Sequence, residues 1–164
     1  MHLEFDALDF ERRFLADLLG MLAVRLTTLH GYVDRERQEE SDVFDPMEHL
    51  AGIGVVAAQR YIASICNWRS VDREQALQLG PKRKGVPIAS VIHAAANYWK
   101  HIEDGDGQIR PATRRVLEQL GVRTDADYCV TNTLYECGYS QLQGLMDDLI
   151  VWRDAVIAEQ QQNG

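Results

Sequence analysis

Apolar residues recur three and four positions apart along most of the 164-residue chain, which is the spacing typical of amphipathic α-helices. Acids and prolines that favour helix starts precede several of these segments, and glycines follow them. Regular alternation of apolar and polar residues, which would indicate half-buried strands, is poor. The sequence predicts helices over residues 6–31, 45–68, 72–80, 87–104, 111–120 and 124–137, and a last helix from residue 140 that frays from about residue 160.

Two helix starts are especially clear in the sequence. Asp45-Pro46-Met47-Glu48 combines a capping acid, a proline in the first turn and a second acid. Ser140 and Gln143 resemble a capping box, in which each side chain bonds the backbone N–H of the other residue. We expect residues 32–45, which are rich in Arg and Glu, to connect the first two helices. Residues 124–137 mix β-branched and aromatic residues, so that helix and loop are both open there.

The predicted helices each carry an apolar stripe, and stripes of this kind pack against one another in a bundle. Hydrophobic residues make up 46% of the chain and charged residues 26%, which are ordinary values for a globular protein. We therefore predict an all-α fold, a single-domain helical bundle of about five main helices that spans residues 1–164. Core packing is expected for the large residues on these stripes, among them Phe14, Trp68, Trp99, Ile102 and Trp152.

The cysteine pattern and the N-terminus bear on the compartment. Cys66, Cys129 and Cys137 are odd in number and show no CxxC spacing, which favours buried thiols in a reducing compartment. The N-terminus lacks a basic segment followed by an apolar one, and the longest apolar run, Leu50 to Ala58, is too short to cross a bilayer. We expect a cytoplasmic protein without membrane association. Motifs for zinc, calcium, di-iron or nucleotide binding are incomplete, so neither a metal nor a cofactor is expected.

The net charge of −8 argues against a general affinity for nucleic acid, but the charge is unevenly distributed. Residues 81–123 hold eight basic residues against four acidic ones. The triplet Lys82-Arg83-Lys84 stands between glycines and prolines, where an exposed loop that binds a phosphate is expected. Arg110 and Arg114 follow in the same basic window, which leaves a local phosphate-binding face open.

A polar strip runs along the predicted helix 87–104. At about 100° per residue, His93, Asn97, Lys100 and His101 fall on one side of this helix, opposite its apolar stripe. Histidine suits proton transfer near neutral pH, and lysine stabilises the charge that develops on a phosphoryl group. The strip is therefore a candidate catalytic site for metal-independent RNA cleavage. The structural alternative is a contact between helices or subunits.

The segment Ala95–His101 resembles an Ala-Asn-Tyr-aromatic-Lys-His patch found in many small helical proteins of bacteria and their phages. Several such proteins resemble the HEPN superfamily, whose members are helical bundles, often dimeric, and in many cases ribonucleases of toxin or defence systems. The resemblance implies a homodimer that cleaves RNA without a metal ion. In such an enzyme we expect His101 or His93 to act as general acid or base and Asn97 to orient reacting groups. Lys100, together with Arg110 or the loop Lys82–Lys84, would hold the phosphates.

The better-known signature of that superfamily is an arginine followed a few residues later by a histidine. Arg25 and His30 have such a spacing, but Leu26 stands where a polar residue usually follows the arginine. On a continuous helix the two side chains would point about 140° apart, so we favour the polar strip as the site.

Two functions of different class remain open after this reading. The first is an enzyme, a HEPN-like endoribonuclease whose partner is RNA. The second is a non-catalytic helical module that binds a protein partner, as an immunity protein, an antitoxin or a phage accessory factor would. The acidic segment 36–45 favours the second function, because it would attract a basic partner.

Overall fold

The computed structural model describes residues 2–36, 41–103 and 108–163. Over these ranges the chain is mostly helical (77%) and forms a tightly packed all-α bundle, which confirms the predicted class. Seven α-helices lie in the described ranges, two of them short, in place of about five main ones. The elements are α1 (His2–Glu36), α2 (Ser41–Arg69), α3 (Arg73–Ala76), β1 (Lys82–Arg83), β2 (Val86–Pro87), α4 (Ile88–Glu103), α5 (Pro111–Gln119), α6 (Cys129–Glu136), the 3₁₀ turn η1 (Ser140–Leu142) and α7 (Leu145–Asn163).

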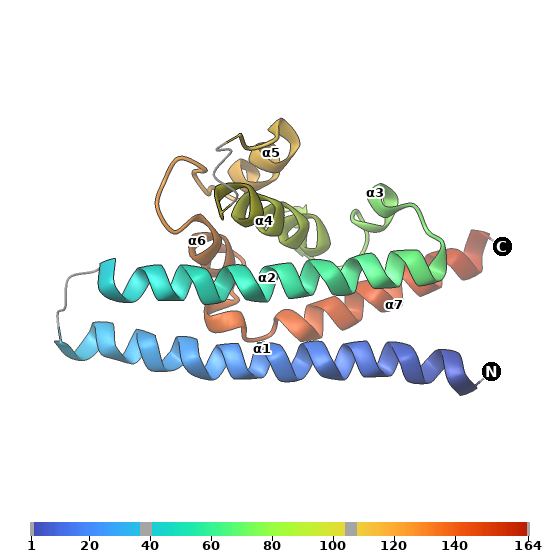
Figure 1. Cartoon of the computed structure of the whole chain (residues 1–164). Helices are drawn as coiled ribbons and strands as arrows, with labels where there is room; N and C mark the ends of the chain where they lie inside the picture. Colours follow the sequence, from blue (N-terminus) through green and yellow to red (C-terminus); the bar gives the residue numbers. More distant parts are fainter. Residues whose placement is uncertain (1, 37–40, 104–107, 164) are drawn as a thin grey trace.

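Three long helices form the base of the molecule. Figure 1 shows α1, α2 and α7 running alongside one another, while α4 crosses over α2 and α5 lies beyond α4. The crossing of α2 and α4 is close because small residues line it: an added Cβ at Gly52 would overlap the indole ring of Trp99. Helix α4 therefore sits in the centre of the fold, with contacts to α2, α5, α6 and α7.

The apolar stripe of α4 is buried as predicted, with Ile88, Val91, Ile92 and Ala95 fully covered. Trp152 of α7 is also fully buried, and its indole N–H donates to the carbonyl of Ala76 at 2.9 Å. Three other predicted core residues lie at the surface. Trp68 stacks against the Arg69 guanidinium at 4.0 Å, Ile102 is 46% exposed at the end of α4, and Phe14 is exposed on α1.

The first two helices are longer than predicted. Helix α1 begins at His2 and passes through Gly31 to Glu36, and α2 begins at Ser41, so the expected connector 32–45 is wrong for most of its length. A glycine inside a helix costs only about 1 kcal/mol, and Pro46 removes a single backbone donor near the start of α2. Packing across the α1–α2 contact outweighs both local signals.

The predicted starts of the later helices hold in part. Asp72 caps α3, where its carboxylate accepts from the Gln75 N–H at 2.9 Å, and Pro111 begins α5. Helix α4 begins at Ile88, one residue after Pro87, and the expected stop at 104–107 lies outside the described residues.

The segment after α5 departs further from expectation. Residues 124–128 form turns, and α6 covers only Cys129–Glu136 after Tyr128 adopts a left-handed conformation (φ 59°). The capping box at Ser140 and Gln143 is wrong. Ser140 begins a 3₁₀ turn, and α7 starts at Leu145 after Gly144 at φ 77°.

The expected basic loop is a tight hairpin. Strands β1 and β2 pair antiparallel, with Lys82 opposite Pro87 and Arg83 opposite Val86. The two turn residues, Lys84 and Gly85, both have positive φ (49° and 80°), as a type I′ turn requires. The hairpin fixes where the following helix α4 begins, since the Ile88 N–H donates to the Pro81 carbonyl at 2.9 Å.

Candidate functional site

A cavity of about 320 Å³ lies between α2 and α4 and receives part of the predicted polar strip. His93, Asn97 and Lys100 reach it from α4, because their spacing places them on the side of α4 that faces α2. The remaining lining residues come from α2 and from the start of α3: Val56, Gln59, Arg60, Ile62, Ala63 and Arg73. We call this the cationic cavity.

Gln59 joins the three strip residues into one network. Its side-chain nitrogen lies 2.8 Å from Oδ1 of Asn97, 3.1 Å from Nδ1 of His93 and 3.3 Å from the His93 carbonyl. Its side-chain oxygen accepts from Nζ of Lys100 at 2.7 Å. The amide nitrogen has two hydrogens to share among these three acceptors, and the amide oxygen accepts from Lys100, so a single amide from α2 holds three residues of the polar strip in place.

The network favours one position for the proton of the neutral His93 ring. Lys100 can only donate, so the Gln59 atom that faces it is the oxygen, and the Gln59 nitrogen faces α4. That nitrogen donates, so Nδ1 of His93 accepts. The neutral ring therefore carries its hydrogen on Nε2. In this arrangement His93 offers a donor, and its lone pair is already in use.

The electrostatics of the cationic cavity are one-sided. Arg60, Arg73 and Lys100 contribute three positive charges, and among the side chains that the structure describes no carboxylate lines the cavity. The pKa of His93 is lowered, first by burial and then by the nearby charges of Arg73 and Lys100. His93 is therefore neutral near pH 7, and the cavity attracts an anion with its lysine, its arginines and the Nε2–H of the ring.

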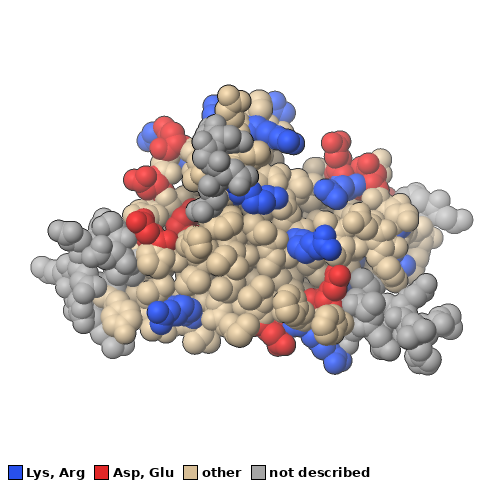
Figure 2. Space-filling view, viewed as in Figure 1, with Lys and Arg blue, Asp and Glu red and all other residues tan. Residues whose placement is uncertain are grey.

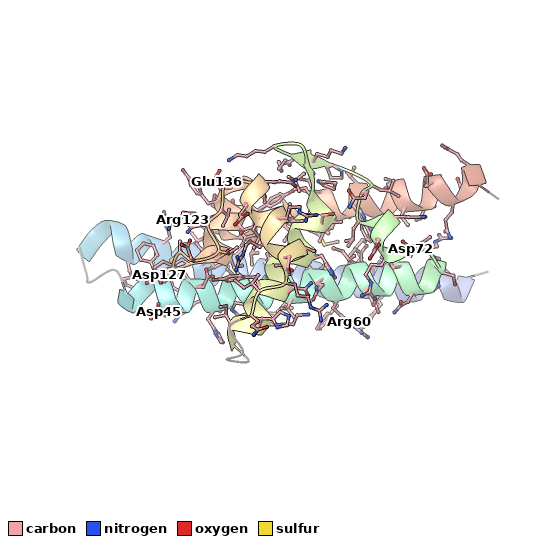
Figure 3. All side chains as sticks on the ribbon, turned by 90° about the horizontal axis from the view of Figure 1, so that it is seen from above. Asp45, Arg60, Asp72, Arg123, Asp127 and Glu136 are labelled. Carbon is pink, nitrogen blue, oxygen red and sulfur yellow. The ribbon has the colours of Figure 1, made fainter. Side chains whose placement is uncertain are left out.

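Charged side chains are unevenly distributed around α4. Figure 2 shows basic side chains to the right of the near end of α4 and mostly acidic ones to its left. Figure 3, from above, shows α4 crossing α2 with Arg60 on α2 beside the crossing. The positive charge that the sequence assigns to residues 81–123 is thus joined here by arginines from α2 and α3, which lie outside that window.

His101, also part of the predicted site, is half-buried and does not line the cationic cavity. It stands one residue beyond Lys100, so its side chain points away from Lys100 by about 100° around the helix. Among the described residues that line the cavity, His93 is therefore the one imidazole. Arg25 and His30 are both exposed on α1, also outside the cavity.

The basic triplet has structural contacts of its own. Arg83 donates to Asp148 and, at 3.2 Å, to the Cys137 carbonyl, which ties the hairpin to α7 and the end of α6. Lys84 donates to Glu136 and, at 3.1 Å, to the Leu120 carbonyl. Lys82 is exposed. Arg110 and Arg114, at the start of α5, are exposed and also lie outside the cavity.

Sequence reasoning missed Gln59, Arg60 and Arg73. Gln59 and Arg60 follow an apolar run on α2, where the sequence predicts only the edge of a buried face. Arg73 follows the capping residue Asp72, and nothing in the local sequence distinguishes it from any other residue in a first helical turn. The one available signal is that Gln59 interrupts small and apolar residues on the helix that packs against the polar strip. Only the α2–α4 crossing brings these residues together with Lys100.

A second cavity, of about 570 Å³, lies on the other side of α4 and is acidic. Asp45, Asp125 and Asp127 line it together with Glu48 and several aromatic rings. Glu48 already has a structural role there. Its carboxylate accepts from the first N–H groups of α6, at 2.7 and 2.8 Å, and from the Thr131 hydroxyl at 2.6 Å.

Comparison of the chain with protein-family models, with curated proteins and with solved structures finds no match. The resemblance of Ala95–His101 to HEPN-like proteins therefore stays a prediction. In the part of the chain that the structure describes, no three His, Cys, Asp or Glu side chains are grouped so that they could hold a metal ion.

Proposed function

We propose that the protein binds RNA and holds one of its phosphate groups in the cationic cavity. The observation that supports this is the lining, in which the described residues supply three cations and an imidazole and no carboxylate. Phosphate oxygens are bound by Lys and Arg side chains and by N–H donors of this kind. Because the chain as a whole carries a charge of −8, binding is confined to this face and the acidic remainder repels RNA.

The HEPN-like reading adds a reaction, metal-independent cleavage of the bound phosphodiester by a toxin or defence protein. In this step the ribose 2′-oxygen bonds to phosphorus and the bond to the 5′-oxygen breaks, while water takes the 2′-hydroxyl proton. A neutral imidazole is too weak an acid to protonate the leaving 5′-oxygen, so His93 donates its Nε2 proton only after the bound phosphate has raised its pKa and Nδ1 has taken up a proton. Lys100 and the two arginines stabilise the charge on the non-bridging phosphate oxygens. For His93 to act as a base, its Nδ1 must first lose the hydrogen bond from Gln59. Binding therefore comes first in this proposal, and cleavage is its second step.

Binding is tested by fluorescence anisotropy with a labelled single-stranded RNA in EDTA. Lys100→Met should raise the Kd by about tenfold, the loss of one phosphate contact at about 1.4 kcal/mol. The matched control is Lys82→Met, which removes the same charge from an exposed position on the hairpin. Equal weakening by both variants, or no RNA binding by the wild type, contradicts the proposal. Circular-dichroism melts confirm that both variants are folded.

Cleavage is tested by incubating the wild type, His93→Gln and His101→Ala with transfer RNA and total RNA in EDTA. The proposal expects products with the wild type and with His101→Ala, but not with His93→Gln. If His101→Ala alone abolishes cleavage, the catalytic group lies outside the cationic cavity. If no protein cleaves RNA even at high concentration, the cleavage step is wrong and RNA binding is judged separately from the anisotropy data.

The second candidate function is a non-catalytic module that binds a basic protein partner. The acidic cavity beside α6 favours it, since Asp45 and Asp127 place carboxylates near aromatic rings there; Asp125 also lines the cavity but is already paired with Arg123 at 2.9 Å. Such a surface attracts Lys- and Arg-rich segments. A lysine-rich peptide should bind the wild type and lose affinity for Asp127→Asn, while Asp147→Asn, at an exposed position of α7 outside this cavity, serves as the matched control.

A further inference from the structure

Helix α1 exposes an unusual amount of apolar surface. Phe10, Phe14, Met21 and Val24 are 70%, 62%, 66% and 69% exposed, and Tyr32 is 46% exposed. Single exposed apolar residues are common, but a row of five large ones marks an interaction site. Figure 1 shows why they are uncovered: α2 and α7 pack on one side of α1, and its other side is open.

The spacing of these residues is that of a helix–helix seam. Positions 10, 14, 17, 21, 24 and 28 follow one another at alternating steps of four and three, the a and d pattern of a coiled coil. The seam from Phe10 to Tyr32 extends along roughly 33 Å of helix at 1.5 Å per residue. The buried face of α1, with Leu15, Leu19, Leu22 and Leu26, already packs in the bundle core. The exposed seam is therefore separate from the core face.

Asp17 and Arg25 indicate what covers the seam. Residues 10–32 are long and apolar enough to span a membrane by length and composition, but Asp17 stands in the middle of the exposed seam. A bilayer would bury that carboxylate without a partner, which is costly. Neither the Asp17 nor the Arg25 side chain makes a hydrogen bond or an ion pair with another described residue. A covering surface that places a basic residue beside Asp17 and an acidic residue beside Arg25 would form an ion pair with each of them.

We infer that a second copy of this chain covers the seam, with the two α1 helices antiparallel and a two-fold axis at Met21. This arrangement places Asp17 of each copy beside Arg25 of the other, and it sets Phe10 against Tyr32. A parallel arrangement in register would instead place the two Asp17 carboxylates together. Two-fold interfaces are self-complementary in this way. The inference does not depend on the cationic cavity.

Cross-linking through single cysteines tests the geometry on the full chain. The native cysteines are buried, so added cysteines dominate the reaction. Met21→Cys should give a disulfide-linked dimer on mild oxidation, Phe10→Cys alone should not, and the double variant Phe10→Cys/Tyr32→Cys should. Cross-linking by Phe10→Cys alone would indicate a parallel pair and overturn the inference.

Light scattering after size exclusion tests the assembly and its charges. The wild type should have twice the 18.6 kDa mass of the chain, and Asp17→Arg should raise the dimer Kd by at least about tenfold, because it places Arg beside Arg. The exchange Asp17→Arg/Arg25→Asp should restore the dimer. A monomeric wild type at all concentrations, or a monomer that sediments with phospholipid vesicles, contradicts the inference.

Discussion

The close packing of the Trp99 indole against Gly52 gives the clearest stability prediction. A Cβ at Gly52 of α2 would overlap three ring atoms of Trp99, namely Nε1, Cε2 and Cδ1, all at less than 3.0 Å. Because this contact belongs to the α2–α4 crossing that forms the cationic cavity, Gly52→Ala tests the basis of the site as well as of the fold. The indole must move, or α4 must move with it.

The expected magnitude follows from two opposing effects. Replacing a glycine inside a helix by alanine stabilises it by about 1 kcal/mol. Overpacking costs about 1–3 kcal/mol or more, and the upper end applies here since three ring atoms are displaced at once. The net loss is about 2 kcal/mol, which lowers the Tm of a chain of this size by roughly 4–8 °C.

Gly20→Ala is the matched control, because Gly20 lies inside α1 with no atom within 4 Å of an added Cβ. It should raise the Tm by roughly 2–4 °C, the propensity effect alone. The double variant Gly52→Ala/Trp99→Leu should recover part of the loss, since the smaller side chain frees the space. Differential scanning calorimetry measures all three. If Gly52→Ala is as stable as Gly20→Ala, the packing of α4 on α2 is wrong.

Three further outcomes are expected. Glu48→Gln should lower the Tm by roughly 4–8 °C in thermal melts, because the charged carboxylate that accepts from the first N–H groups of α6 stabilises the fold by about 2 kcal/mol. An unchanged Tm would contradict that role. Because the pKa of His93 is lowered in the folded protein, the unfolded ring takes up a proton more readily as the pH falls below 6.5, and the free energy of unfolding decreases. His93→Gln should remove this part of the pH dependence when the free energy of unfolding is measured by urea titration at several pH values. An unaltered pH dependence would count against the lowered pKa. Burial raises the pKa of Cys129 to about 12 and that of Cys137 to about 11, so a thiol reagent at mildly alkaline pH should label them only after unfolding, and rapid labelling of the native protein would refute their burial.

The sequence predicts the helical class, and it predicts that His93, Asn97 and Lys100 share a face, because these features depend on local periodicity. It does not predict Gln59 or Arg73, which join the site only through tertiary packing. Local signals also mislead where packing outweighs them: Pro46 lies inside α2 rather than at its start. The uncovered side of α1 could not be predicted either. This helix has two apolar faces, one with Phe14 and one with Leu15, and the sequence pattern does not show which of them enters the core.

The central claim is that a phosphate group binds in the cationic cavity, next to His93. The most direct measurement is the pH titration of the His93 ring by NMR, without and with a short single-stranded RNA. A bound phosphate adds a negative charge beside a ring whose pKa is lowered by burial and by two cations, so RNA should raise that pKa. Lys82→Met should leave the effect intact, and Lys100→Met should weaken it. If RNA binds while the His93 titration stays unchanged, the phosphate lies elsewhere and the account is wrong.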